Sequence, residues 1–162
     1  MWSGWRAAYL GEVEASGRAS ALSPFTQMLE SDMPDTETNI VYRGDTVFAI
    51  MNRFPYTTGH VLVLPYREVP DLTDLTAEES IEMWATVTDA LAAVRAAFRP
   101  DGVNVGMNLG SASGGSVPTH VHAHVVPRWA GDTSFMSSIA NVQTLPEALD
   151  VSADRLRTAW PK

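Results

Sequence analysis

The chain has 162 residues, of which 45 % are hydrophobic and 19 % charged, a balance typical of one folded domain rather than of a disordered or low-complexity protein. Its net charge of −8 disfavours binding to nucleic-acid polymers, and the absence of cysteine excludes disulfides, thiolate metal sites and thiol nucleophiles. No segment has the pattern of a signal peptide or a bilayer span, so we expect a cytoplasmic protein with no membrane partner.

The first part of the chain predicts an acidic loop followed by three strands. Acidic residues gather around Pro34, between Glu30 and Glu37, and indicate an exposed loop. The β-rich runs 40–43 and 46–51 are separated by Gly44-Asp45, a tight hairpin signal. A third strand is expected at 60–64, ended by Pro65.

A long helix is predicted next. Thr76 and Glu79 have the spacing of a capping box, and Pro100 marks the end of the helix. Apolar residues at steps of three and four predict that one stripe of this helix is core: Ile81, Trp84, Val87, Leu91, Val94 and Phe98.

The last part of the chain completes the fold prediction. Strands are expected at 103–109 and at 120–126, the latter stopped by Pro127, and a weaker helical pattern covers 144–160. This order predicts an α+β domain with a mostly antiparallel five-stranded sheet, one long helix and a shorter C-terminal helix.

Three of the four histidines alternate along the fifth predicted strand, at positions 120, 122 and 124, and the fourth is His60. Because alternate strand residues share a face, the three imidazoles are expected to form one row. The row has three interpretations: hydrogen-bonded structural histidines, a metal site, or nucleophilic catalysis. A single metal ion is disfavoured because the row spans about 13 Å and no carboxylate lies close in sequence.

Nucleophilic catalysis is the interpretation that the surrounding residues favour. A neutral imidazole attacks phosphorus well, provided that its second nitrogen is held to fix the tautomer. His122, in the middle of the row, has a histidine on each side for that task. The loop from Gly110 to Ser116 is rich in Gly and Ser and follows Asn108, so its N–H and hydroxyl groups could hold a phosphate.

The chain resembles the histidine triad (HIT) family of nucleotide hydrolases and transferases. The matching runs are His120-Val121-His122-Ala123-His124-Val125-Val126-Pro127-Arg128 and, upstream, Gly59-His60-Val61-Leu62-Val63-Leu64-Pro65. Asn104–Gly110, Gly114–Ser116, Pro127–Asp132 with Phe135, and the N-terminal Trp2–Arg6 with Tyr9-Leu10 resemble the diadenosine tetraphosphate phosphorylase branch. The resemblance covers a core of about 40–135 in a single domain spanning 1–162, with 1–39 and 136–162 as extensions packing on it.

The resemblance implies a role for each histidine. His122 would attack the α-phosphorus of a dinucleoside polyphosphate and form a nucleotidyl-histidine intermediate. His124 would assist the departing nucleotide, and His120 and His60 would form a hydrogen-bonded relay that orients the nucleophile. Substrate-binding positions are also implied: Asn52 for the ribose, and Asn108, Gly115 and Ser116 for phosphate.

The implied activity is phosphorolysis of diadenosine tetraphosphate to ATP and ADP by a homodimer or higher homo-oligomer. Hydrolysis of the same compounds or of nucleoside phosphoramidates is the alternative within the family, and a nucleotide-binding sensor is the non-enzymatic one. No cofactor is implied other than Mg²⁺ entering with the nucleotide.

Two departures from the family pattern bear on this expectation. Many relatives carry a Cys-Pro-x-Cys pair that binds zinc, whereas this chain has Ser23-Pro24-Phe25-Thr26, so no structural metal is predicted. Hydrolases of the family tend to have Gln four residues before the first triad histidine, where this chain has Ser116. The shorter side chain favours phosphate over water as the second nucleophile.

Overall fold

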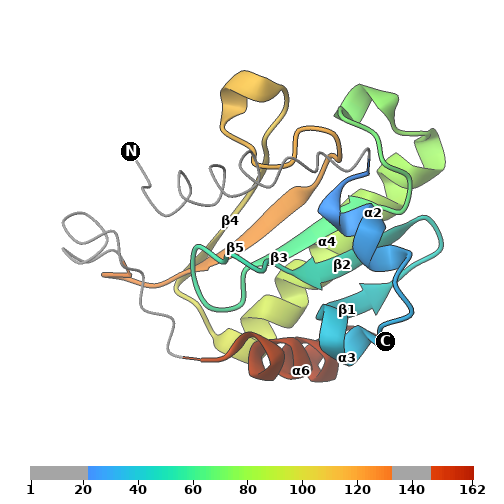
Figure 1. Cartoon of the computed structure of the whole chain (residues 1–162). Helices are drawn as coiled ribbons and strands as arrows, with labels where there is room; N and C mark the ends of the chain where they lie inside the picture. The colour runs from blue at the N-terminus through green and yellow to red at the C-terminus, as the bar shows by residue number, and fades with distance from the viewer. Residues whose placement is uncertain (1–21, 133–146) are drawn as a thin grey trace, which may run out of the picture.

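The computed structural model describes residues 22–132 and 147–162, which contain a five-stranded sheet with neighbouring strands in the order β1-β2-β3-β5-β4 (Figure 1). Every neighbouring pair is antiparallel, so the expected α+β fold with an antiparallel sheet is confirmed. The strands are β1 (Ile40–Arg43), β2 (Val47–Met51), β3 (Val61–Pro65), β4 (Gly102–Met107) and β5 (Ala123–Arg128).

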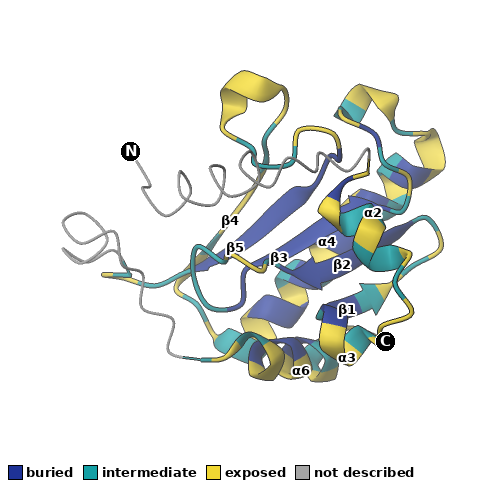
Figure 2. Cartoon of the chain, viewed as in Figure 1, coloured by how far each residue is buried: buried dark blue, intermediate teal, exposed yellow. Residues whose placement is uncertain are grey.

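Helices cover both faces of this sheet (Figures 1 and 2). One face packs against α4 (Ala77–Phe98) and α6 (Leu149–Ala159), and the other is covered by α2 (Pro24–Leu29). The remaining helical segments are α3 (Asp35–Thr38) and the 3-10 turns η1 (Leu72–Asp74) and η2 (Ser111–Ser113). None of the helices in the described ranges is long and apolar enough to cross a membrane.

The long helix begins as predicted but buries a different face. The Thr76 hydroxyl accepts a hydrogen bond from the N–H of Glu79, whose carboxylate accepts one from the N–H of Thr76, so the capping box is present. The predicted stripe is wrong at its start, because Ile81 is 74 % exposed and Trp84 is 45 % exposed. The buried positions of α4 are instead mostly small or unbranched: Glu79, Met83, Thr86, Val87, Ala90, Ala93 and Val94.

The fifth strand is also shifted from its prediction. It begins at Ala123, so His120 and His122 precede it, and it runs through Pro127 to Arg128. The pairing of β3 with β5 ends at Val61 and Val125. Proline is tolerated at 127 because β3 does not reach this position, so its missing N–H removes no hydrogen bond between these two strands. On the other side, Pro127 still lies opposite Val103 of β4.

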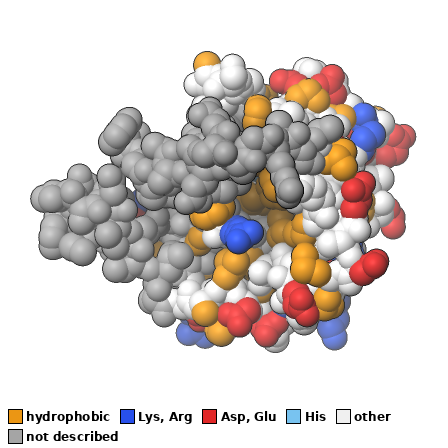
Figure 3. Space-filling view, viewed as in Figure 1, with side chains coloured by type: hydrophobic (Ala, Val, Ile, Leu, Met, Phe, Trp, Pro, Cys, Tyr) orange, Lys and Arg blue, Asp and Glu red, His pale blue; other side chains and the backbone are white. Residues whose placement is uncertain are grey.

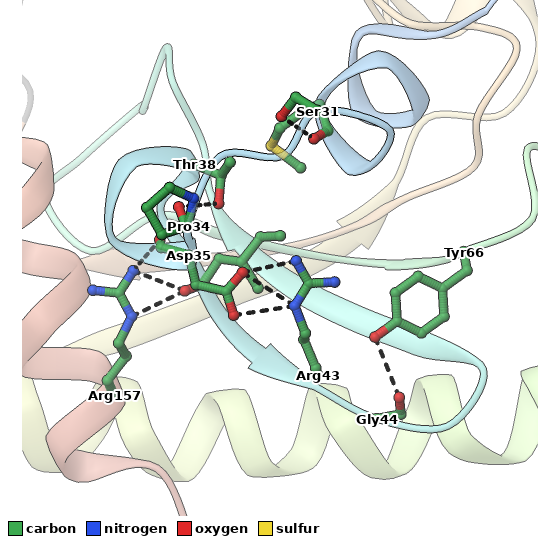
Figure 4. A network of polar contacts seen from close by, with 10 residues as sticks. Ser31, Pro34, Asp35, Thr38, Arg43, Gly44, Tyr66 and Arg157 are labelled. Atoms are coloured by element: carbon green, nitrogen blue, oxygen red, sulfur yellow. Dashed lines mark hydrogen bonds and ion pairs between the residues drawn. The ribbon is translucent and has the colours of Figure 1, made fainter.

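The acidic segment 30–37 is not simply the solvated loop that was expected, because α3 starts within it. Asp35 forms an ion pair with Arg43 at 2.7 Å, and its backbone carbonyl accepts a hydrogen bond from Arg157 of α6 (Figure 4). The same guanidinium donates to the carbonyl of Ile40. Arg157 therefore joins α6 to both α3 and β1. The N-terminal motif at residues 2–10 and Phe135 lie outside the described residues.

Candidate active site

Three of the four histidines meet at the edge of α2, where β3 and β5 lie side by side. His60 comes directly before β3, and His124 lies in β5 opposite Leu62. The ring centroids of His60 and His124 are 5.2 Å apart, and those of His122 and His124 are 4.9 Å apart. All three side chains are buried. The cluster is therefore a connected group of imidazoles shielded from bulk water.

The tautomer of His122 follows from its backbone contact. Its Nδ1 lies 2.7 Å from the carbonyl oxygen of His120. A carbonyl oxygen only accepts hydrogen bonds, so Nδ1 carries the proton and Nε2 of the neutral ring has the lone pair. His122 is thus held as the tautomer that a nucleophile requires.

The tautomers of His60 and His124 follow from a second fixed donor. The backbone N–H of Tyr56 donates to Nδ1 of His60 at 3.1 Å, so the His60 proton must sit on Nε2. His60 Nε2 in turn lies 2.9 Å from Nδ1 of His124 and donates to it. The proton of His124 is therefore on Nε2, which makes that atom a hydrogen-bond donor.

Burial keeps His60 neutral. The largest cause is desolvation, and the neighbouring His124 and His122 add to it, so the pKa of His60 lies well below its usual value of 6.5. In a neutral His60, Nδ1 accepts the hydrogen bond from Tyr56 and Nε2 donates the hydrogen bond to His124.

The two candidate asparagines both contact the hydrogen-bonded pair His60 and His124. Asn52 approaches Nδ1 of His60 through Nδ2 at 3.3 Å, and its Oδ1 accepts from the N–H of Phe54 at 3.0 Å. The amide of Asn108 lies 3.2 Å from Nε2 of His124. The atom placed there is Nδ2 of Asn108, and a half-turn of the amide brings its oxygen into position to accept a hydrogen bond from the Nε2–H of His124. The ribose and phosphate roles expected of them stay predictions.

The Gly/Ser loop is tied to the same region through Gly115. A Cβ built at this position would lie 3.2 Å from Cβ of Asn108, so the loop and the asparagine are in close contact. Gly110 and Gly114 adopt positive φ angles of 73° and 82°, which lets the chain reverse around η2. Ser116 is half-buried at the end of this loop.

His120 lies outside the series of hydrogen bonds that runs from Tyr56 through His60 to His124. The expected relay between His120 and His60 is wrong, because His60 bonds to His124 instead. His120 Nε2 lies 2.8 Å from the carbonyl of Pro65, and its Nδ1 lies 2.8 Å from the hydroxyl of Ser23, the residue that caps α2. The reason is the shifted strand: residues 120–122 precede the ladder, so their rings do not form a straight row.

Sequence patterns did not reveal the residues around His120. Phe25 packs edge-on to the His120 ring, with centroids 5.6 Å apart, and also contacts the His122 ring at 5.5 Å. Glu68 accepts hydrogen bonds from the residues that begin α2. The Ser23-Pro24 pair is a helix-start signal that could have predicted α2, but its contact with a histidine 97 positions away leaves no local trace.

A zinc ion does not fit the site that relatives use for it. Hydroxyls stand where the Cys-Pro-x-Cys pattern has its thiolates, and those of Ser23 and Thr26 are engaged with His120 and Glu68. Within residues 22–132 and 147–162, no three His, Cys, Asp or Glu side chains gather so that they could hold a metal ion. Hydrogen bonds from Ser23 and Thr26 join the start of α2 to His120 and Glu68.

The chain is similar to several known proteins. The AP-4-A phosphorylase of Mycobacterium tuberculosis is 39 % identical, over 100 % of this chain and 84 % of that protein. The bis(5'-adenosyl)-triphosphatase of Dictyostelium discoideum is 36 % identical, over 65 % of this chain and 70 % of its own. A Zn-bound histidine triad family protein from Mycobacterium smegmatis is 32 % identical, with a TM-score of 0.67 over 83 % of this chain and 90 % of that one.

The family model described as HIT domain matches residues 34–131, a range that holds the whole sheet and all four histidines. Together with the full-length relative and the shared fold, this match shows that the chain belongs to the HIT family.

Proposed function

We propose that this chain cleaves dinucleoside polyphosphates, with diadenosine tetraphosphate as the substrate, by phosphorolysis to ATP and ADP. The observation that carries the proposal is the hydrogen bond from Nδ1 of His122 to the His120 carbonyl, which leaves the lone pair on Nε2. The full-length similarity to an AP-4-A phosphorylase supports the choice of substrate and of phosphate as acceptor.

In the first step, Nε2 of His122 attacks the α-phosphorus of one adenylate. A P–N bond forms, the P–O bond to the remaining phosphates breaks, and ATP leaves with the electron pair of that bond. In this step the Nε2–H of His124, which faces the Asn108 amide before substrate binds, donates its hydrogen bond to the departing oxygen instead. The imidazole of the adenylyl-His122 intermediate is cationic, and the His120 carbonyl on its Nδ1–H stabilises that charge.

In the second step, an oxygen of inorganic phosphate attacks the same phosphorus from the side that ATP has left. The P–N bond breaks, its electrons return to Nε2 of His122, and ADP is released. We assign contacts with the phosphate to Asn108, Gly115 and Ser116, because Gly115 lies against Asn108 and Asn108 against His124. No redox partner or resident cofactor takes part, and Mg²⁺ enters only with the nucleotide.

Hydrolysis is the second candidate, since a triphosphatase of the same family is 36 % identical to this chain. Water in place of phosphate would release AMP from the same intermediate. The short Ser116 side chain leaves room for phosphate beside the reacting phosphorus, which is why phosphorolysis is preferred.

A homodimer is part of the proposal. β4 is an edge strand, in which Gly102, Asn104, Val105 and Gly106 are exposed. An uncovered edge with an apolar residue, Val105 at 43 % exposure, is a natural surface for pairing with another sheet. Sedimentation velocity should give twice the chain mass of 17.6 kDa, and Val105→Lys should shift the population toward the single-chain mass. A wild type that sediments only at the single-chain mass contradicts this proposal.

The covalent intermediate is the direct test of the mechanism. The protein is mixed with diadenosine tetraphosphate and Mg²⁺ in the absence of phosphate, quenched at alkaline pH where phosphoramidates persist, and digested for mass spectrometry. We expect adenylate on the peptide that carries His122, and none in His122→Ala. Adenylate on another residue, or tight nucleotide binding without any adenylation, would replace the proposal with another mechanism or with a sensor.

A further inference from the structure

We infer that Ser23 and Glu68 are positioning residues, which hold the His120 ring and through it the backbone carbonyl that fixes the tautomer of His122. The inference rests on the proposed function for its kinetic consequence. Its structural part concerns one juxtaposition: the first turn of α2 and Glu68 lie against the buried side chain of His120.

The segment that carries the His120 carbonyl precedes the paired part of β5. β5 starts at Ala123, which pairs with Val63 of β3 and Met107 of β4, and residues before it belong to neither ladder. Next to that carbonyl, the N–H of Val121 donates to the carbonyl of Val69 at 2.7 Å. The place of the carbonyl therefore depends on what anchors the side chain of His120.

The His120 ring is anchored at both nitrogens and is fully buried. The Pro65 carbonyl can only accept, so the proton of the neutral ring is on Nε2 and Nδ1 accepts from the Ser23 hydroxyl. The Ser23 oxygen also accepts the N–H of Thr26 and so caps α2. One hydroxyl thus connects the last residue of β3, through the ring, to the start of a helix.

Glu68 fixes that hydroxyl in turn. Its carboxylate accepts the N–H of Ser23 at 2.8 and 3.0 Å and the hydroxyl of Thr26 at 2.6 Å. Desolvation alone would raise the pKa of Glu68, but the hydrogen bonds from Thr26 and Ser23 outweigh it and the pKa lies below its usual value. The carboxylate is therefore charged at neutral pH, the state in which both oxygens accept.

These contacts form one path from Glu68 through Ser23 and the ring of His120 to its carbonyl and the Nδ1–H of His122. None of the first three residues needs to touch the substrate. A displacement of the carbonyl by a fraction of an ångström weakens its hold on His122 and with it the orientation of Nε2.

The test uses Ser23→Gly and Ser23→Thr in the full chain. Glycine at a helix N-cap costs only a few tenths of a kcal/mol, so Ser23→Gly removes the hydroxyl from His120 with little loss of α2. Ser23→Thr keeps a hydroxyl and is the rescue variant. Ser31→Ala, which removes a hydroxyl bonded to Met28 at the far end of α2, is the matched control.

The readouts are long-range ¹H–¹⁵N spectra of the four histidines without substrate, and kcat and KM for diadenosine tetraphosphate. In the wild type we expect protons on Nε2 of His120 and Nδ1 of His122. In Ser23→Gly we expect Nδ1 of His120 to lose its hydrogen-bonded shift, the His122 Nδ1–H to exchange with water about tenfold faster, and kcat to fall roughly tenfold at unchanged KM. His60 Nε2–H, which Ser23 does not contact, should be unchanged.

Ser23→Thr and Ser31→Ala should match the wild type in both readouts, and Glu68→Gln, with one accepting oxygen, should move in the direction of Ser23→Gly. Unaltered spectra of His120 and His122 in Ser23→Gly would overturn the inference, and so would a fall in kcat that Ser23→Thr does not reverse. If the wild type cleaves no nucleotide, the proposed function fails alone, because the spectra still decide whether Ser23 holds His120.

Discussion

At the scale of single residues, the chemistry depends on which nitrogen of each ring bears the proton. Three backbone groups decide this: the carbonyl of His120 for His122, the N–H of Tyr56 for His60 and His124, and the carbonyl of Pro65 for His120. Backbone groups cannot change their donor or acceptor character, so the tautomers are fixed by the fold and not by a substrate. The lone pair on His122 and the proton on His124 are the complementary pair that a displacement at phosphorus needs.

Replacing His122 by alanine should abolish turnover and leave nucleotide binding largely intact. The nucleophile is lost, while the residues expected to hold phosphate and ribose remain. We expect the rate of diadenosine tetraphosphate cleavage to fall by at least about a thousandfold. Calorimetric titration with a non-cleavable analogue should give a dissociation constant within a few-fold of the wild type. A variant that keeps a tenth of the activity would rule out His122 as the nucleophile.

The buried histidines predict how stability depends on pH. Burial lowers the pKa of His60 well below 6.5 and lowers that of His120 as well, so both stay neutral in the folded chain while the unfolded chain takes up protons near 6.5. The free energy of unfolding is thus fully present above pH 6.5 and falls below it, by up to about 1.4 kcal/mol per pH unit for each histidine. The carboxylates whose pKa values are lowered in the folded chain, such as Glu68 and Glu79, reduce the free energy of unfolding only at still lower pH, where the unfolded chain protonates them.

Urea unfolding at pH 7.5, 6.0 and 5.0 measures this dependence, and His60→Gln, which has no titratable ring, should flatten it. A wild type equally stable at all three values would mean that these histidines take up protons as readily in the folded chain as in the unfolded chain, which would contradict their lowered pKa values.

Residue patterns predicted that the histidines of 120–124 lie close together but not how they are connected. Alternation along 120–124 identified the cluster, and the upstream motif added His60. The partner of His120 could not be predicted, because Ser23 reaches it from 97 positions away and its own sequence context indicates only a helix start. Contacts between segments distant in sequence leave no periodicity to detect.

At the scale of elements, the turn that delivers His60 depends on Gly59. This residue has a φ of 79°, and a Cβ added to it would lie 2.6 Å from the Phe98 ring at the end of α4. Gly59→Ala therefore combines a left-handed backbone with an overlap in the core and should destabilise the fold by about 3 kcal/mol. Urea unfolding checks this, with Gly102→Ala as control, since nothing lies within 4 Å of a Cβ there. Equal stability of the two variants would contradict the argument.

The positions of strands and helices were predictable where a run of apolar residues, or a repeat of them at helical spacing, is ended by a turn or proline signal. The face of α4 was not, because a helix that packs closely on a sheet buries small residues such as Ala90 and Ala93 and leaves Trp84 outside. β5 shows the converse: Pro127 looks like a stop, but an unpaired side of the strand tolerates it.

At the scale of the whole molecule, the proposed function requires an acidic protein to bind a polyanion. The net charge is −8, and acidic side chains lie along the right and lower rim of the face in Figure 3, around hydrophobic ones near its middle. The long-range field therefore repels the substrate, and the site has to overcome this with local donors.

This repulsion predicts an unusual salt dependence. Raising NaCl from about 10 to 150 mM shortens the screening length from roughly 30 to 8 Å. At constant Mg²⁺, kcat/KM for diadenosine tetraphosphate should rise by a few-fold over this range, because the repulsion is screened more than the contacts inside the site. A steep fall would instead mean that basic groups dominate the encounter.

The central claim is best tested by product analysis. The protein is incubated with diadenosine tetraphosphate and Mg²⁺, with and without inorganic phosphate, and AMP, ADP and ATP are separated by chromatography. The account predicts ATP and ADP in equal amounts, and only where phosphate is present. AMP with ATP in the phosphate-free sample would assign the chain to hydrolysis, and no product in either sample would contradict its assignment as an enzyme acting on this compound.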